Sequence, residues 1–286
     1  MSTLNQHLAK NGICNVAPIY TSQQIAEINA LADPIFASRK EQARSYVYAD
    51  EIGSSGMLPL VLSQNMRNCL LSVMPDPVLY HMHIYEIAEN QSQPHIFSET
   101  MAGWHRDHDS ENGGKKATHV SIFVYLTDVE LENGPFEFIP QPPFLWLQKN
   151  TKYVSMIGKA GSSFVWNRNF YHRAAPNRSS IRRRLLKISI QNNKFISRHL
   201  TNEHFKPLIA ATKEGDIMLD MLLGRYQAKS VDAPLLKPEE AMQFDAVNPN
   251  NKMNLSNKYL TEWQARMMVR ALRHRIKNGS KNAEYD

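Results

Sequence analysis

The stretch Thr118-His119-Val120-Ser121-Ile122-Phe123-Val124-Tyr125-Leu126 is rich in β-branched and aromatic residues, and this composition predicts a strand. Asn133-Gly134-Pro135 then predicts a turn, and residues 136–140 predict a short second strand that ends in proline. Residues 79–86 alternate in polarity and predict a further strand before this pair. The middle of the chain is therefore expected to consist mainly of short β-strands.

Two histidines and one aspartate lie beside the predicted strands. His105 and Asp107 are two residues apart in Trp104-His105-Arg106-Asp107, and His172 follows a strand predicted from residue 161 to 166 and running into it. Residues i and i+2 of a strand point to the same side, so His105 and Asp107 can face one ion while His172 reaches it from another strand. Two imidazoles and one carboxylate form the facial triad of non-haem Fe(II), which leaves positions open for a co-substrate and oxygen. In a chain with eleven histidines the His-x-Asp pair alone is a weak signal, and its place among strands strengthens it.

The segment from Trp104 to Gln191 resembles the phytanoyl-CoA dioxygenase family of Fe(II)/2-oxoglutarate oxygenases. The shared features are a Trp-His-x-Asp motif at 104–107, an Asn-Gly-Pro turn at 133–135, a Gly-led strand before His172, a Pro-Asn-x-Ser turn at 176–179 and an arginine eleven positions after His172. Residues 11–28 also resemble the family's opening strand and first helix. Many relatives follow the proline of the short strand with Gly-Ser-His, whereas this chain has Gln141-Pro142-Pro143, so the shape of that loop is expected to differ.

The resemblance implies that His105, Asp107 and His172 are the metal ligands and the catalytic centre, with Fe(II), 2-oxoglutarate and O2 as cofactors. It also implies that the arginine of a strand at 182–190, Arg183, binds the distal carboxylate of 2-oxoglutarate. Arginine suits this role because it is permanently charged and binds carboxylates in a bidentate manner. The three consecutive arginines leave this choice open by one residue. Arg182 and Arg184 face the opposite side of a regular strand, and the spacing from His172 favours Arg183. Halogenating relatives replace the aspartate by a small residue, so Asp107 indicates hydroxylation or another oxidation.

The fold implied by the resemblance is mainly β with flanking helices around a double-stranded β-helix, the jelly-roll or cupin-like core. One oxygenase domain is expected over residues 1–286, with a helical part at about 1–75, the jelly-roll core at about 79–195 and a helical extension at about 200–286. Thr21 and Gln24 have the spacing of a capping box and predict the start of a helix. Residues 35–65 are expected to be polar and irregular, with a flexible joint at 53–56.

Composition and charge fit an enzyme of the cytoplasm. The 286 residues are 42% hydrophobic, enough for a buried core, and the two cysteines, Cys14 and Cys69, lack the spacing of a redox or metal motif. No signal peptide and no apolar run of about twenty residues is found, so no membrane span is expected. Residues 266–277 hold five Lys and Arg residues and no acid within a net charge of +6. They predict a basic amphipathic helix, for which a solvated outer face is favoured over contact with a membrane or a nucleic acid.

The expected function is hydroxylation or a related oxidation of a small organic metabolite, with release of succinate and CO2, in secondary-metabolite biosynthesis. Two alternatives stay open: a nucleic-acid demethylase of the same chemistry, and a non-catalytic metal-binding jelly-roll module. His81 and His83 form a second i, i+2 pair, which could face the substrate or complete a different metal site. His119 could face the interior near the co-substrate or make a cross-strand hydrogen bond. No pattern identifies the substrate or the oligomeric state, and no nucleic-acid partner is expected.

Overall fold

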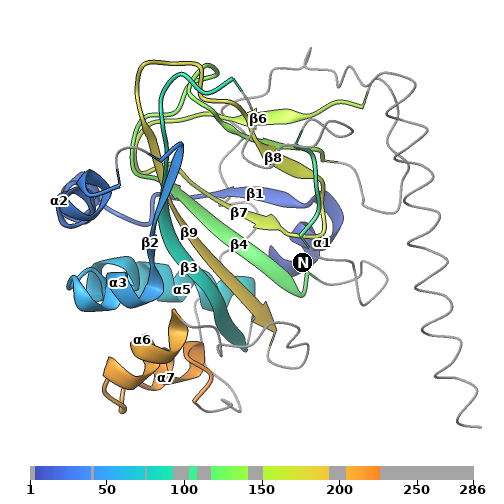
Figure 1. Ribbon diagram of the computed structural model, residues 1–286. Coiled ribbons are helices and arrows are strands. Elements are labelled where there is room, and N and C mark those ends of the chain that lie inside the picture. The colour runs from blue at the N-terminus through green and yellow to red at the C-terminus, as the bar shows by residue number, and fades with distance from the viewer. Residues whose placement is uncertain are drawn as a thin grey trace, which may run out of the picture.

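The computed structural model describes residues 4–39, 42–74, 76–92, 103–107, 117–140, 151–192 and 204–225. Two antiparallel sheets form the centre of the molecule (Figure 1). The major sheet has the strand order β1-β7-β4-β9-β3-β2, and the minor sheet has the order β6-β5-β8. The major strands are β1 (Ile13–Val16), β2 (Arg44–Tyr48), β3 (Pro77–Ile87), β4 (His119–Tyr125), β7 (Ser163–Asn167) and β9 (Arg183–Asn192). The minor strands are β5 (Phe136–Phe138), β6 (Val154–Met156) and β8 (His172–Ala174). This arrangement confirms the predicted jelly roll, which is mainly β with few helices.

The two faces of the major sheet pack against different partners because successive side chains of a strand point to opposite sides. On one face Ile122 and Ile188 are fully buried in a large core that they share with the helices. On the other face Phe123 and Leu185 belong to a smaller core that includes Phe136 of the minor sheet. The second core therefore lies between the two sheets, where the resemblance places the metal.

Helices cover the outer face and one end of the major sheet (Figure 1). They are α1 (Leu4–Asn11), α2 (Ser22–Ala37), α3 (Ala49–Ser54), α4 (Leu58–Val61), α5 (Gln64–Val73), α6 (Phe205–Ala211) and α7 (Ile217–Leu222). The predicted capping box is confirmed at the start of α2: the Gln24 N–H donates to Thr21 Oγ1 (3.2 Å), and the Thr21 N–H donates to Gln24 Oε1 (2.9 Å). Pro207 lies in the first turn of α6. The basic helix predicted at 266–277 lies outside the described residues.

The N-terminal third is more regular than its composition suggests. The prediction of an irregular segment at 35–65 is wrong, because β2, α3 and α4 lie within it and Gly53 is helical. Burial alternates along β2: Ser45 and Val47 are buried, and the residues on either side of them are half-buried. This pattern suits an edge strand that is covered on one face. Both β1 and β2 belong to the major sheet. β1 confirms the opening strand implied by the resemblance of residues 11–28, whereas β2 was not expected in the helical part at 1–75.

The strand predicted at 161–166 is confirmed as β7, but it does not continue into His172. β7 stops at Asn167, and four residues then carry the chain across to the minor sheet, where His172 opens β8. The turn brings Arg168 and His172 to the same end of the molecule as residues 103–107, because both segments exchange backbone hydrogen bonds with that stretch.

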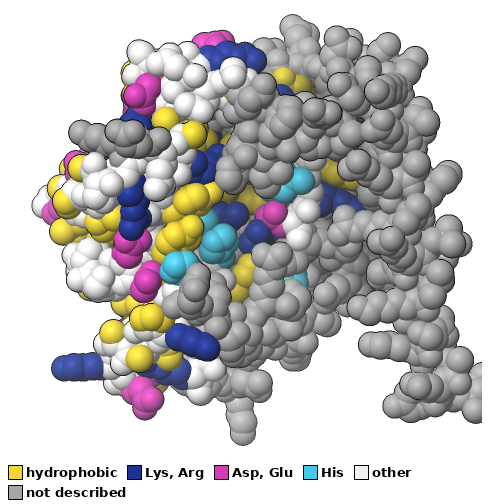
Figure 2. Space-filling model, in the orientation of Figure 1, with side chains coloured by type: hydrophobic (Ala, Val, Ile, Leu, Met, Phe, Trp, Pro, Cys, Tyr) yellow, Lys and Arg dark blue, Asp and Glu magenta, His cyan; other side chains and the backbone are white. Residues whose placement is uncertain are grey.

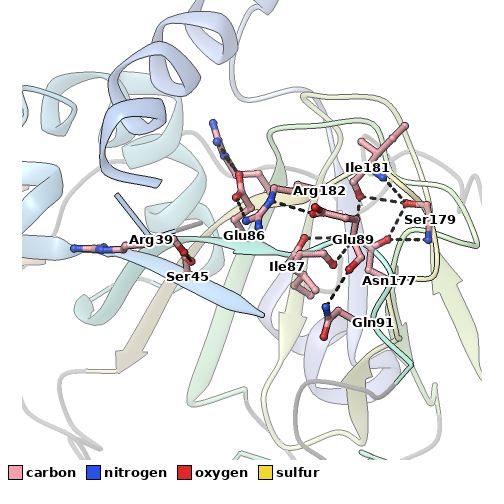
Figure 3. A network of polar contacts seen from close by, with 12 residues as sticks. Arg39, Ser45, Glu86, Ile87, Glu89, Gln91, Asn177, Ser179, Ile181 and Arg182 are labelled. Carbon is pink, nitrogen blue, oxygen red and sulfur yellow. Dashed lines mark hydrogen bonds and ion pairs between the residues drawn. The ribbon is translucent and has the colours of Figure 1, made fainter. Parts of the chain in front are cut away.

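A polar network fixes the connection between β8 and β9 (Figure 3). The buried Asn177 donates through Nδ2 to the carbonyls of Ala88 (3.0 Å) and Ile181 (2.8 Å), and its Oδ1 accepts from the Ser179 hydroxyl (2.8 Å). Arg182 donates to Glu86 of β3 at 2.7 Å. The Pro-Asn-x-Ser turn is thus tied to β3, and this sets the position at which β9 begins.

Candidate metal centre

His105 and His172 lie side by side although they are far apart in the sequence. The His105 N–H donates to the His172 carbonyl (3.1 Å) and the His172 N–H donates to the His105 carbonyl (3.0 Å), as in an antiparallel bridge. The Asp107 N–H donates to the Arg168 carbonyl (3.1 Å). These bonds hold residues 103–107 against the turn that precedes β8, so all three predicted ligands face one point.

The three side chains can converge on one ion. One ligand atom from each of His105, Asp107 and His172 lies within 4.8 Å of the others. The Nε2 atoms of His105 and His172 are each 3.6 Å from an oxygen of Asp107. Two imidazole nitrogens and a carboxylate oxygen on one side are a suitable donor set for Fe(II).

The hydrogen bonds of the His105 and His172 imidazoles leave the Nε2 atom of each ring available to bind a metal. His105 Nδ1 lies 2.8 Å from the Gly103 carbonyl, and His172 Nδ1 lies 2.9 Å from the Phe170 carbonyl. A carbonyl oxygen can only accept, so each Nδ1 carries the proton and each Nε2 presents its lone pair. A second partner of this kind also fixes the orientation of a metal-binding imidazole.

Burial and local charge keep the ligands in the form that a metal needs. Burial lowers the pKa of His172 to about 3 and also lowers the pKa of His105. Burial would raise the pKa of the Asp107 carboxyl, but the adjacent positive charge of Arg168 brings it well below its usual range. At neutral pH the three side chains are therefore two neutral imidazoles and one carboxylate, the protonation states that bind metal.

Arg168 was not identified from the sequence, yet it contacts the centre directly. It is 3% exposed, and its Nε donates to Asp107 Oδ2 at 2.6 Å. Its Nη2 also contacts Oδ2, and its Nη1 donates to the Tyr80 hydroxyl at 2.5 Å. The sequence position of Arg168, four residues before His172, does not indicate a role at the site. Its contact with Asp107 depends on the turn that carries the chain from one sheet to the other.

A cavity of about 220 Å³ opens beside the three predicted ligands. Figure 2 shows histidine, basic and acidic side chains gathered in a hollow beside hydrophobic ones. Aromatic rings form much of its wall, and Trp166 lies with its ring centroid 4.2 Å from that of His172. The lining residues are Arg44, Tyr46, His81, His83, Tyr85, His105, Asp107, Phe123, Phe136, Trp166, Arg168, His172, Ala174 and Lys187. Among them Asp107 is the one carboxylate, so the cavity suits anionic ligands.

Arg183 is fully buried behind this cavity. Its Nη2 donates to the hydroxyl of Tyr85, a lining residue, at 2.6 Å, while its Nε and Nη1 are buried without a hydrogen-bond partner among the described residues. Arg44 lies over the same ring, 4.8 Å from its centroid, and its Nη2 is also buried without such a partner. The register explains this proximity, since Ile87 pairs with Arg44 on β2 and with Arg183 on β9. Arg44 was missed in the sequence because β2 itself was missed.

A comparison with protein families identifies the chain. The family model for phytanoyl-CoA dioxygenase (PhyH) matches residues 8–185, more than half of the 286 residues. The chain belongs to this family. This PhyH chain is accordingly a 2-oxoglutarate-dependent non-haem iron enzyme, an oxidoreductase with iron and 2-oxoglutarate as its cofactors.

Several solved structures share the fold of the PhyH chain. The non-haem α-ketoglutarate-dependent epimerase SnoN from nogalamycin biosynthesis is 18% identical, with 65% of this chain and 78% of that chain covered and a TM-score of 0.50. AviO1 from Streptomyces viridochromogenes Tue57 is 15% identical, with 68% and 97% covered and a TM-score of 0.54. EvdMO1 is 16% identical, with 65% and 48% covered and a TM-score of 0.53. At such identities the likeness shows the fold alone. No curated protein matches the chain.

The other histidines of the PhyH chain take different positions. His81 and His83 both line the cavity, with Nε2 of His81 2.9 Å from Nδ1 of His83, and no third ligand joins them among the described residues. His119 is buried, with its Nδ1 3.1 Å from Thr118 Oγ1 and its ring centroid 5.7 Å from that of Tyr80 on β3. His108 lies outside the described residues. Within the described part of the chain no helix is long and apolar enough to cross a membrane.

Proposed function

We propose that this enzyme hydroxylates, or oxidises in a related way, a small organic metabolite in secondary metabolism, at an iron held by His105, Asp107 and His172. The observation that carries the proposal is the convergence of three ligand atoms within 4.8 Å, with both Nε2 atoms unprotonated and facing a cavity. Location in the cytoplasm and a single oxygenase domain are parts of the same proposal.

The iron and 2-oxoglutarate supply the oxidising chemistry when bound, and O2 is the oxidant. The protein orients them: the backbone bridge between His105 and His172 fixes two imidazoles on one side, so the opposite side remains for co-substrate and substrate. Asp107 occupies the third protein position, where a small residue would instead leave room for chloride. This carboxylate supports oxidation of the substrate over chlorination.

Arg183 and Arg44 are the residues proposed to hold the distal carboxylate of 2-oxoglutarate. Both guanidinium groups lie within 5.3 Å of the Tyr85 ring centroid and have buried nitrogens without partners among the described residues. A buried charge without a partner is costly, and a ligand carboxylate would supply that partner. Arg183 is the primary candidate because it is fully buried and two of its nitrogens, Nε and Nη1, lack partners among the described residues.

The cavity favours a small substrate over a nucleic acid. Its volume of about 220 Å³ is below the usual range for ligand pockets of roughly 300–1,000 Å³. Its wall combines aromatic rings with histidines, three cationic side chains and one carboxylate, which suits a small anionic co-substrate. A non-catalytic module would have no need for a fully buried arginine and a half-buried one beside the metal cavity, and their presence favours a working co-substrate site.

Anaerobic titration tests the proposal. Fe(II) and then 2-oxoglutarate are added to the protein, and the weak visible charge-transfer band of the chelate is followed. We expect a saturable band in the wild type and none in His105→Ala or His172→Ala, with the exposed Arg178→Gln as a control for loss of a charge. Candidate metabolites are then screened by mass for a gain of oxygen coupled to succinate release. A wild-type protein that binds Fe(II) without forming the band would refute the proposal.

A further inference from the structure

Arg168 contacts one oxygen of Asp107 and leaves the other oxygen to the metal. Its Nε donates to Oδ2 at 2.6 Å, and its Nη2 contacts the same atom. A carboxylate oxygen has about two lone-pair positions for hydrogen bonds, so these two contacts fill Oδ2. Oδ1 has no such contact with Arg168. Each oxygen also lies 3.6 Å from an imidazole nitrogen, Oδ1 from Nε2 of His105 and Oδ2 from Nε2 of His172, so the contacts with Arg168 are what distinguish them.

We propose that Arg168 is a positioning residue that makes Asp107 a one-oxygen ligand of the iron. Both oxygens lie beside the imidazoles, but the hydrogen-bonding positions of Oδ2 are taken by the guanidinium, so Oδ1 is the oxygen that keeps a lone pair for an ion. The position that a chelating carboxylate would take therefore stays available to the co-substrate or to O2. This inference rests on the metal site of the proposed function and assigns a role to a residue outside the family motif recognised in the sequence.

The guanidinium is fixed independently of any metal. The Arg168 N–H donates to the His119 carbonyl (3.1 Å), and its own carbonyl accepts from the Asp107 N–H (3.1 Å). Its Nη1 donates to the Tyr80 hydroxyl at 2.5 Å. Because the side chain is 3% exposed, its charge is poorly solvated and the contact with Asp107 is strongly favoured. The orientation of the carboxylate is thus set before the ion arrives.

Cobalt(II) substitution tests this role without turnover. Co(II) replaces iron in the wild type, in Arg168→Gln, in Arg168→Lys and in the exposed control Arg178→Gln, and the visible d–d spectrum and the dissociation constant are measured. In Arg168→Gln the freed Oδ2 can join the ion, so we expect weaker d–d bands and a change in affinity of about ten- to a hundredfold. Arg168→Lys offers one donor in place of two, so an intermediate spectrum is expected. Arg178→Gln should match the wild type.

The outcomes separate positioning from a role in folding alone. Thermal unfolding of the metal-free variants shows whether each one folds. A folded Arg168→Gln with the wild-type Co(II) spectrum overturns the inference, whatever its melting temperature. If Arg168→Gln does not fold, Arg168→Lys decides: an intermediate spectrum supports the inference and a wild-type spectrum overturns it. A wild-type protein that binds no Co(II) would instead remove the proposed metal site, and the inference with it.

Discussion

Replacing Arg183 with glutamine should weaken binding of 2-oxoglutarate strongly and disturb the fold little. In the structure its guanidinium makes a hydrogen bond to the Tyr85 hydroxyl at 2.6 Å, while Nε and Nη1 are buried without partners among the described residues. Loss of that bond costs about 1 kcal/mol of unfolding free energy. Removal of a buried charge that lacks a carboxylate offsets this cost. The melting temperature of the metal-free variant should therefore stay within about 4 °C of the wild type.

The effect on the co-substrate is much larger because the ligand carboxylate loses two charge-assisted hydrogen bonds. Removing one partner of a buried, hydrogen-bonded ion pair costs about 3–5 kcal/mol. At about 1.4 kcal/mol for each factor of ten, the dissociation constant of 2-oxoglutarate should rise from a hundredfold to a few thousandfold. Arg183→Lys keeps the charge without the planar fork, so an intermediate rise of about tenfold is expected.

The assay is the anaerobic charge-transfer titration with wild type, Arg183→Gln, Arg183→Lys and the exposed control Arg178→Gln. Fe(II) affinity is measured separately, since Arg183 contacts none of the three proposed ligands. A dissociation constant for 2-oxoglutarate within threefold of the wild type in Arg183→Gln would refute the assignment. A parallel loss of Fe(II) affinity would point to a general disturbance of the site instead.

Three further outcomes are expected. Alanine at His105, Asp107 or His172 should abolish turnover and lower Fe(II) affinity, while the metal-free protein still melts cooperatively. If a variant binds iron and turns over as the wild type does, the substituted residue is not a metal ligand. Burial raises the pKa of the Cys69 thiol to about 12 and that of Cys14 to about 11, against an ordinary value of 9.0. The contribution of the two neutral thiols to the free energy of unfolding is therefore complete below pH 9 and is lost as pH rises towards these values. Melting temperatures measured from pH 8 to 11 should show this decline, and Cys69→Ala should make the fall of melting temperature with pH less steep. Thr21→Ala removes the cap of α2 and should cost about 1 kcal/mol, a fall of about 2–4 °C in melting temperature, whereas an unchanged value would show that the cap contributes nothing.

Local sequence signals predicted the parts of this enzyme that local chemistry determines. The composition of the strands at 119–125 and 183–192, the capping box at Thr21 and the spacing from His172 to Arg183 could all be read directly. The site residues that escaped prediction are those placed by long-range pairing. Arg44 reaches the Tyr85 ring only because β2 adds to the edge of β3, and its short strand lies within a polar segment with no strong strand pattern.

The three consecutive arginines of the sequence show how the sheet separates similar charges. Arg182 and Arg184 bind Glu86, which pairs with Arg184 in the register of β3 and β9, so both are compensated on the outer side. Arg183 points to the inner side, where the described residues offer it the Tyr85 hydroxyl and no carboxylate. The alternation of a strand thus gives identical side chains opposite environments. We propose that a ligand supplies the charge that balances Arg183, and we therefore expect co-substrate binding to depend on the inner arginine rather than on its neighbours.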